Sequence, residues 1–196
     1  MRSAAILAGG QATRFGGQDK SALLVGGRTI RERQIAELSR VTNDILIVVA
    51  RAGDRDPEPV ATRTVVDIVP GCGPLGGLHT ALTEARGDAV FVVACDMPFI
   101  DRALVEYLLE LTHEADIVVP RTERGYHPLC AAYTKACLPA VDRRLADRQL
   151  KMSDVFADVR TRVVTSEEID RFGDRNRLLA NVNTQAEYAG IQTHKL

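Results

Sequence analysis

The stretch SAAILAGGQATRFGGQDK, residues 3–20, decides the fold. A short apolar run, residues 3–7, leads directly into a glycine-rich segment that carries Arg14 and Lys20. Glycines allow positive φ, and the successive N–H groups of such a turn form a concave nest for anions at the carboxyl edge of a sheet. The segment therefore predicts a phosphate-binding loop after the first strand. The alternative is a surface turn with ordinary exposed basic residues.

The rest of the chain alternates short β-branched runs with helical spacing. The expected further strands are 45–49, 64–68, 89–94, 117–119 and 162–164. Several of them are apolar on both faces, which is typical of a sheet covered by helices on two sides. Three inward helix faces are expected, at Ile35 and Leu38, at Leu75, Leu78 and Leu82, and at Leu104, Val105, Leu108 and Leu109.

These patterns predict an α/β fold, a Rossmann-like three-layer sandwich formed by a single domain over residues 1–196. The central sheet is expected to be mostly parallel. Residues 126–134 are expected to form a strand that runs back across its end, which makes the sheet mixed. Asp101 is expected to cap the third helix, and Gly26-Gly27 to form a tight turn.

Bulk composition excludes several classes of function. A net charge of −1 and only 5% aromatic residues argue against nucleic-acid binding. No apolar stretch approaches the roughly 18 residues that a membrane span needs, and the apolar start runs into glycines rather than a cleavage site. The four cysteines lack C-x-x-C spacing, which favours free thiols in a reducing compartment. We therefore expect a cytoplasmic protein with no membrane partner.

The glycine segment has neither the G-x-G-x-x-G nor the P-loop spacing. Leu7-Ala8-Gly9-Gly10, followed by Arg14-Phe15-Gly16 and Lys20, instead resembles the signature of the nucleotidyltransferase superfamily, in particular its molybdenum cofactor guanylyltransferase branch. The resemblance spans nearly the whole chain, in order, through Asp67, Gly73-Pro74-Leu75-Gly76-Gly77, Asp96-Met97-Pro98-Phe99, His127-Pro128 and Asn181-Val182-Asn183-Thr184.

The resemblance implies that GMP is transferred from GTP to the terminal phosphate of molybdopterin, with release of pyrophosphate. GTP and molybdopterin are the implied substrates and Mg²⁺ the implied cofactor; maturation proteins of molybdoenzymes are a further class of partner that the resemblance suggests. Two alternatives stay open. One is transfer of CMP or another nucleotidyl group to a phosphorylated metabolite, and the other is a non-catalytic nucleotide-binding regulatory protein, against which Lys20 and Asp96 argue.

By the same resemblance, the first loop binds the nucleotide and provides two catalytic cations, Lys20 and Arg14. The implied nucleotide-binding residues are Leu7, Ala8, Gly9, Gly10, Lys20, Asp67 and Asp96. Relatives that use CTP more often have alanine where this chain has Gly9, so the loop favours guanine.

Asp96 follows the apolar run 89–95, which should place it at the carboxyl end of a central strand, where α/β sheets bind ligands. Its hard oxygens suit Mg²⁺, which uses one or two protein carboxylates together with phosphates and water. The resemblance implies that Asp96 is catalytic and holds the metal; the alternative is a helix N-cap. For Asp67 the alternative to a nucleotide contact is a turn residue.

The implied pterin-binding residues are His127, Lys151, Asn181 and Asn183. Alternation along an extended segment should place both asparagine side chains on one side of Val182. A structural turn is the alternative for His127, whereas His79 is expected to be a solvated or capping residue. The basic segment 142–151 is a candidate patch for the pterin phosphate, and a solvated helix face is its alternative. Because the second pKa of a phosphate monoester is about 6, the acceptor needs no general base.

Overall fold

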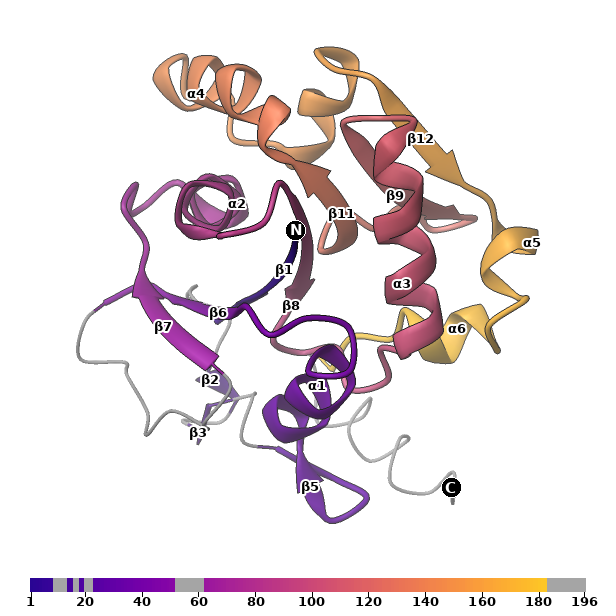
Figure 1. Cartoon of the computed structure of the whole chain (residues 1–196). Helices are drawn as coiled ribbons and strands as arrows, with labels where there is room; N and C mark the ends of the chain where they lie inside the picture. The colour runs from indigo at the N-terminus through magenta and orange to yellow at the C-terminus, as the bar shows by residue number, and fades with distance from the viewer. Residues whose placement is uncertain (9–13, 16–17, 20–22, 52–61, 183–196) are drawn as a thin grey trace.

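The computed structural model describes residues 1–8, 14–15, 18–19, 23–51 and 62–182 (Figure 1). One sheet runs through its centre in the order β10-β9-β11-β8-β1-β6-β7, and β12 also pairs with β9. Its strands are β1 (Arg2–Leu7), β6 (Ile45–Val49), β7 (Thr62–Val66), β8 (Ala89–Ala94), β9 (Ile117–Thr122), β10 (Gly125–Tyr126), β11 (Cys130–Thr134) and β12 (Thr161–Val164). Two small hairpins lie apart from it, β2 (Arg14–Phe15) with β3 (Gln18–Asp19) and β4 (Leu24–Val25) with β5 (Arg28–Thr29).

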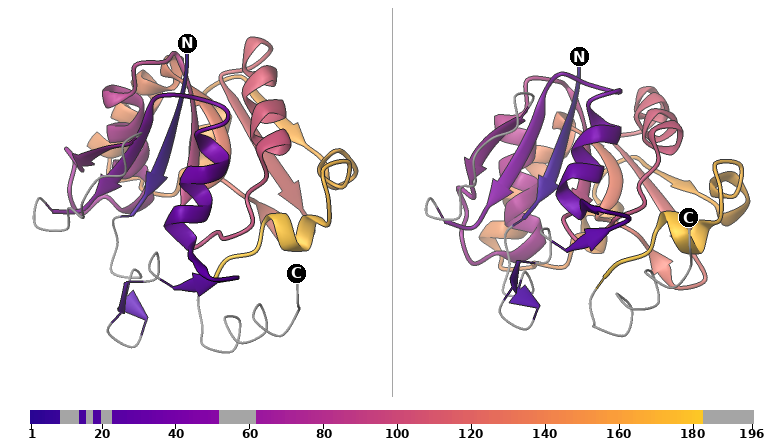
Figure 2. Two further views of the ribbon diagram at one scale, coloured as in Figure 1. Left: turned by 60° about the horizontal axis from the view of Figure 1, so that its bottom comes forward. Right: turned by 90° about the horizontal axis from the view of Figure 1, so that it is seen from below.

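Four neighbouring strands, β7, β6, β1 and β8, run parallel to one another. β11 runs antiparallel to β8 and to β9, which it joins, and this confirms the expected mixed sheet. The carboxyl ends of the four parallel strands meet at one edge, at the far side of the molecule from the N-terminus (Figure 2). That edge is where an α/β sheet of this type binds its ligand.

Helices cover both faces of the sheet, with α1 and α3 on one and α2 and α4 on the other (Figure 1). The helices are α1 (Ile30–Leu38), α2 (Gly73–Glu84), α3 (Arg102–Glu110), α4 (Leu138–Ala146), α5 (Ser166–Ile169) and α6 (Arg175–Leu178), and the 3-10 turns are η4 (Leu111–His113), η5 (Lys135–Cys137) and η6 (Met152–Ala157).

Alternation along the strands produces two separate cores. In β1, Ala4 and Ile6 pack into the core beneath α1 and α3, whereas Ala5 and Leu7 pack into the core beneath α2 and α4. Successive strand side chains point to opposite faces, so a strand that is apolar throughout supplies both layers. The predicted three-layer sandwich is confirmed.

Local signals fix where helices begin. Thr29 and Glu32 form a reciprocal capping box at the start of α1. The Asp101 carboxylate accepts from the backbone N–H groups of Ala103 and Leu104, which confirms the predicted cap of α3. Gly26-Gly27, with φ of 59° and 80°, forms the turn between β4 and β5, also as expected.

Three expectations need correction. β7 covers Thr62–Val66 rather than 64–68, and Ile68 is exposed in the turn that follows. Residues 126–134 do not form one strand, because a turn containing Pro128, which has no N–H to donate, separates β10 from β11. His79, expected to be a solvated or capping residue, has a side chain that is only 16% exposed, and its Nε2 atom lies 2.9 Å from the Asp142 carboxylate of α4.

A buried carboxylate closes the amino-terminal edge of the sheet. Asp44, 1% exposed, accepts from Ser3 Oγ at 2.6 Å, from the Arg86 N–H at 2.8 Å and from Arg63 Nε at 3.1 Å. Burial raises the pKa of Asp44, but these three donors outweigh it and leave the pKa below its usual value. The network joins β1, β7 and the turn before β8 to the start of β6.

Candidate nucleotide-binding site

The predicted site begins where β1 and β8 end side by side. Leu7 pairs with Ala94 in the strand register. The ladder continues past the strands, because the Cys95 N–H donates to the Leu7 carbonyl at 3.3 Å and the Ala8 N–H donates to the Val48 carbonyl at 2.8 Å. Leu7, Ala8 and the segment that carries Asp96 are therefore held next to one another.

Asp96 stands directly after β8 and the buried Cys95, which matches the sequence prediction. Its carbonyl accepts from the Val182 N–H at 2.9 Å, and its Oδ1 atom is shielded from solvent. The helix-cap alternative is wrong, because α3 begins only at Arg102 and Asp101 caps it. Asp96 thus lies in the turn between the strand and the helix, at the ligand-binding edge.

Gln34 is a residue that sequence reasoning missed. It is fully buried on α1, and its Nε2 atom donates to the Ala94 carbonyl at 2.7 Å and to the Met97 carbonyl at 3.0 Å. These two carbonyls bracket Asp96, so Gln34 fixes the turn that carries the carboxylate. A signal was present, since Gln34 is a polar residue four positions from Ile30 and from Leu38, on the buried face of the helix.

Asp67 follows β7 at the same edge, and its N–H donates to the Val49 carbonyl at 2.8 Å. Its Oδ1 atom accepts from the Val69 N–H and from Thr80 Oγ1, each at 2.9 Å. The turn role that the sequence left open is therefore present. Asp67 belongs to the edge, but one of its oxygens already serves the local backbone and α2.

Close packing explains the glycine pair at the start of α2. A Cβ on Gly76 would lie 2.7 Å from the Val69 carbonyl oxygen and 3.2 Å from Asp67 Oδ2. A Cβ on Gly77 would lie 3.2 Å from a methyl group of Leu7. The glycines thus let α2 approach the ends of β1 and β7 without displacing either.

Several predicted site residues lie outside the described part of the chain. Gly9, Gly10, Lys20 and Asn183 are among them. Arg14 belongs to β2, where it pairs with Asp19 in the strand register, and only its backbone is described. The roles assigned to these five residues remain predictions.

Asn181 is brought close to the Asp96 turn by its neighbour. Val182 donates to the Asp96 carbonyl and is buried with Leu23, Val25 and Ile30, whereas Asn181 is exposed. The expected alternation of exposed asparagine and buried valine is therefore observed for this pair.

His127 lies in the turn between β10 and β11. Its N–H donates to the Pro120 carbonyl at 2.9 Å, its carbonyl accepts from the Cys130 N–H at 3.0 Å, and its Nε2 atom lies 2.9 Å from Thr122 Oγ1. Burial lowers the pKa of His127, and the nearby Arg124 guanidinium lowers it further. The imidazole is thus neutral near pH 7 and is tied into the turn, which favours the structural reading.

Lys151 precedes η6 and is 77% exposed, 3.8 Å from the Asp154 carboxylate. The structure brings it into no hydrogen bond with the described residues of the predicted site. In the same basic segment, the Arg144 guanidinium donates twice to Asp158, at 2.7 and 2.9 Å. This part of the segment is therefore neutralised internally, as expected of a solvated helix face.

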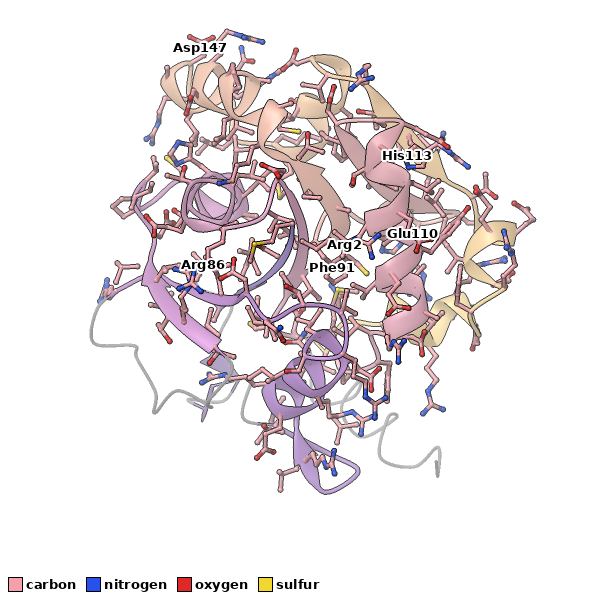
Figure 3. All side chains as sticks on the ribbon, in the orientation of Figure 1. Arg2, Arg86, Phe91, Glu110, His113 and Asp147 are labelled. Carbon is pink, nitrogen blue, oxygen red and sulfur yellow. The ribbon has the colours of Figure 1, made fainter. Side chains whose placement is uncertain are left out.

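The described residues line at least two cavities. One, of about 490 Å³, lies beside Pro98 and Phe99, immediately after Asp96. The other, of about 620 Å³, lies at the opposite edge of the sheet near the N-terminus. Arg2, Glu110 and His113 line it (Figure 3), and Arg2 and Glu110 are 3.9 Å apart. Its position away from the carboxyl ends of the strands argues against a nucleotide site there.

The family model described as the MobA-like NTP transferase domain matches residues 4–162. The chain belongs to this family. The match runs from β1 into β12 and so includes the whole edge that carries Leu7, Asp67 and Asp96.

Two relatives of this MobA-like NTP transferase share one functional name. The chain is 34% identical over 184 residues to the probable molybdenum cofactor guanylyltransferase of Pelotomaculum thermopropionicum, covering 93% of this chain and 87% of that protein. It is 30% identical to the molybdenum cofactor guanylyltransferase of Desulfosudis oleivorans, covering 93% and 90%.

Solved structures show the same fold. Molybdopterin-guanine dinucleotide biosynthesis protein A from Archaeoglobus fulgidus superposes with a TM-score of 0.81 at 20% identity, covering 98% of this chain and 97% of that one. 2-C-methyl-D-erythritol 4-phosphate cytidylyltransferase from Thermus thermophilus superposes with a TM-score of 0.70 at 15% identity, covering 96% of each. The fold alone therefore does not select the base.

The described residues contain no helix long and apolar enough to cross a membrane. They also contain no group of three or more His, Cys, Asp or Glu side chains that could enclose a metal ion. A metal at this edge would have to be completed by ligands from elsewhere, such as phosphate oxygens and water.

Proposed function

We propose that this protein transfers GMP from Mg·GTP to the terminal phosphate of molybdopterin and releases pyrophosphate. The position of Asp96 carries the proposal, since this carboxylate stands at the carboxyl end of β8 beside Leu7 and Ala8, the residues that precede the predicted phosphate loop in sequence. Support also comes from relatives at 30% and 34% identity that are named molybdenum cofactor guanylyltransferases.

The residues present fit a magnesium ion. Asp96 provides a hard oxygen ligand at the ligand-binding edge, and Mg²⁺ typically needs only one or two protein carboxylates because phosphates and water complete its octahedron. Asp96 would hold the ion, and Asp67 is the second carboxylate at this edge, with one oxygen already engaged by Val69 and Thr80. When bound, the ion would offset the negative charge that develops on the phosphates.

The chain's own task is alignment rather than proton transfer. A phosphate monoester with a second pKa of about 6 is mostly a dianion at neutral pH and can attack the α-phosphorus unaided. The attacking oxygen must lie opposite the pyrophosphate leaving group, and Lys20 and Arg14 are proposed to stabilise the charge that accumulates there. A serine–histidine–aspartate array is not needed for this chemistry.

Guanine selection is proposed to reside in the backbone of the first loop. Leu7 and Ala8 are fixed by hydrogen bonds to β8 and β6, so their main-chain groups are rigidly presented at the edge of the sheet. Gly9 and Gly10 would continue this surface. The transfer of CMP is the second candidate, because a cytidylyltransferase shares the fold.

The pterin is proposed to bind on the side of Asn181 and Asn183, next to the Asp96 turn, with weaker contributions from His127 and Lys151. We also infer a cytoplasmic protein, because all four cysteines are buried and free, which suits a reducing compartment. Maturation proteins of molybdoenzymes are the proposed recipients of the product.

Pyrophosphate release tests the proposal directly. The purified protein is incubated with Mg²⁺, molybdopterin and each of GTP, ATP, CTP and UTP in turn. Release is expected with GTP, far exceeding the other three, and only when molybdopterin is present. If pyrophosphate is released equally fast or faster with CTP, the proposed guanylyl transfer is wrong and cytidylyl transfer takes its place. No release with any nucleotide, from a protein that still binds GTP, would favour the regulatory alternative.

A further inference from the structure

A second concave site lies behind the Asp96 turn. The cavity of about 490 Å³ is enclosed by α1, by the segment from Pro98 to Asp101 and by the region of α6. These elements lie next to one another, on the side of the sheet opposite α2 (Figure 1). Its volume lies in the range of small-ligand pockets.

Arginines converge on one aromatic ring in this cavity. The Arg177 guanidinium lies 4.7 Å and the Arg33 guanidinium 5.6 Å from the centroid of the Phe99 ring. Arg33 is held rigidly, because its Nε atom donates to the Pro98 carbonyl at 3.1 Å and its Nη1 atom to the Val25 carbonyl at 3.2 Å. Arg28 lines the same cavity.

Arg33 lies close enough to the positive charges of Arg28 and Arg177 to be repelled by both. The pKa of Arg33 is lowered first by burial and then by the charges of Arg177 and Arg28, with Glu37 opposing them. In the described part of the chain no ion pair within 4.0 Å involves Arg28 or Arg177, although Arg28 is close enough to Glu32 to help lower the pKa of that carboxyl. Both arginine side chains are exposed to solvent.

The carboxylates that line the cavity are committed to other partners. Asp101 caps α3, and Asp174 caps α6 by accepting from the Asn176 N–H at 3.0 Å. Glu37 lies 3.7 Å from Arg40 and accepts from the Arg102 N–H at 3.3 Å. The cavity therefore holds an arginine cluster that its own acidic residues do not fully neutralise.

We propose that this cavity, whose lining includes none of Leu7, Asp67 and Asp96, is a second anion site, which binds the phosphate group of a small ligand against Arg28, Arg33 and Arg177. Guanidinium groups pair with phosphate oxygens through parallel hydrogen bonds, and a dianion relieves the repulsion among three like charges. Inorganic pyrophosphate and a phosphate monoester share this chemistry and are its two possible sources.

A tryptophan reporter tests the site. The chain contains no tryptophan, so Phe99→Trp places a single indole at the arginine cluster. Inorganic phosphate, pyrophosphate and phenyl phosphate are each titrated while fluorescence is recorded, and sodium chloride of equal ionic strength is the reference. A saturable change is expected with the phosphates and not with chloride. Whichever of pyrophosphate and phenyl phosphate binds more tightly then shows whether the phosphate group of the ligand comes from pyrophosphate or from a phosphate monoester.

Matched arginine variants separate this site from general charge effects. In the reporter background, Arg28→Gln together with Arg177→Gln is expected to weaken phosphate binding at least tenfold. The control variant, Arg143→Gln, also removes a positive charge, but from an exposed position on α4, on the other face of the sheet. It should leave phosphate binding unchanged. Equal binding in the double variant and the control would overturn the proposal, as would an equal response to chloride.

Thermal denaturation covers the case in which the reporter or the double variant does not fold. Phosphate is expected to raise the melting temperature of the otherwise unaltered protein and of Arg143→Gln, but less that of Arg28→Gln, whose side chain is exposed. Identical shifts in all three would contradict the site. A poly-aspartate peptide that binds the reporter more tightly than any phosphate would overturn the small-ligand assignment. Neither readout depends on nucleotidyl transfer, so failure here leaves the proposed function untouched.

Discussion

Asp44 and Asp96 stand at opposite edges of the same sheet, and their surroundings differ. Around Asp44, a hydroxyl, a backbone N–H and a guanidinium all donate to the carboxylate itself. Around Asp96, hydrogen bonds from Val182 and Gln34 engage the main chain of the turn. The first arrangement neutralises a buried charge, whereas the second positions a side chain.

This difference separates two roles that composition cannot distinguish. A buried carboxylate with several donors ties elements together, and removing it leaves its donors without a partner. A carboxylate whose backbone is fixed at the carboxyl edge of a parallel sheet is placed to meet a ligand. We therefore expect substitutions of Asp44 to change stability and substitutions of Asp96 to change activity.

The largest effect is expected for Asp96→Asn, which keeps the shape of the side chain but removes its charge. Loss of a metal ligand should cost several kcal/mol in the transition state, or roughly a hundredfold to ten-thousandfold in the rate of pyrophosphate release. The Mg²⁺ concentration for half-maximal rate should rise, and the melting temperature should barely change. Asp88→Asn, at the exposed amino-terminal edge, is the control. Undiminished turnover of folded Asp96→Asn would contradict the assignment.

Asp44→Ala should do the reverse. It leaves the donors of Ser3, Arg63 and Arg86 without their acceptor, and removing one partner of a buried charged network typically costs about 3–5 kcal/mol. Urea denaturation should show this loss of the free energy of unfolding. Turnover per folded molecule should stay within about twofold of that of the unaltered protein. A loss of turnover without a loss of stability would contradict the purely structural role of Asp44.

Gln34→Leu should produce a smaller, mixed effect. The Met97 carbonyl would lose the Gln34 amide as its donor, and the Ala94 carbonyl would keep only the longer bond from the Met97 N–H at 3.4 Å, a loss that typically costs about 1–3 kcal/mol. Because these carbonyls bracket Asp96, the Mg²⁺ concentration for half-maximal rate should also rise, which destabilisation alone would not cause. Ile35→Val, a neighbouring core change on α1, is the control for stability. A lowered melting temperature with unchanged Mg²⁺ dependence would restrict Gln34 to a structural role.

The smallest effect is the pH dependence of stability that Asp44 contributes. Its folded-state pKa lies below the usual value, so its contribution is fully present above the unfolded-state pKa of about 3.9 and is lost as pH falls through the folded-state pKa. Urea midpoints measured from pH 6 down to pH 3 should fall more steeply for the unaltered protein than for Asp44→Ala. Parallel curves would show that Asp44 does not titrate as the network requires.

Local sequence signals predicted the architecture well where they are short-range. Strands that are apolar on both faces predicted a sheet covered on two sides, the Asp101 cap was confirmed, and the apolar run before Asp96 placed that residue at the end of β8. Each of these depends on neighbouring residues, whose geometry the chain fixes locally.

Long-range pairing set the limit of sequence reasoning. Gln34 bonds to carbonyls that are 60 and 63 positions away, and Ser3 and Asp44 are 41 apart. No local pattern specifies such partners, because they meet only after the sheet has assembled. The turn role of Asp67 was open for the same reason, since it depends partly on Thr80 from the following helix.

Product identification tests the central claim most directly. The protein is incubated with Mg²⁺, molybdopterin and GTP labelled with ³²P at the α-phosphorus, and the pterin product and pyrophosphate are quantified. We expect the label to move onto the pterin as GMP, with one pyrophosphate released for each GMP transferred, and Asp96→Asn to abolish most of both. Label that remains in GTP, or that appears as free GMP without a pterin adduct, would contradict the claim.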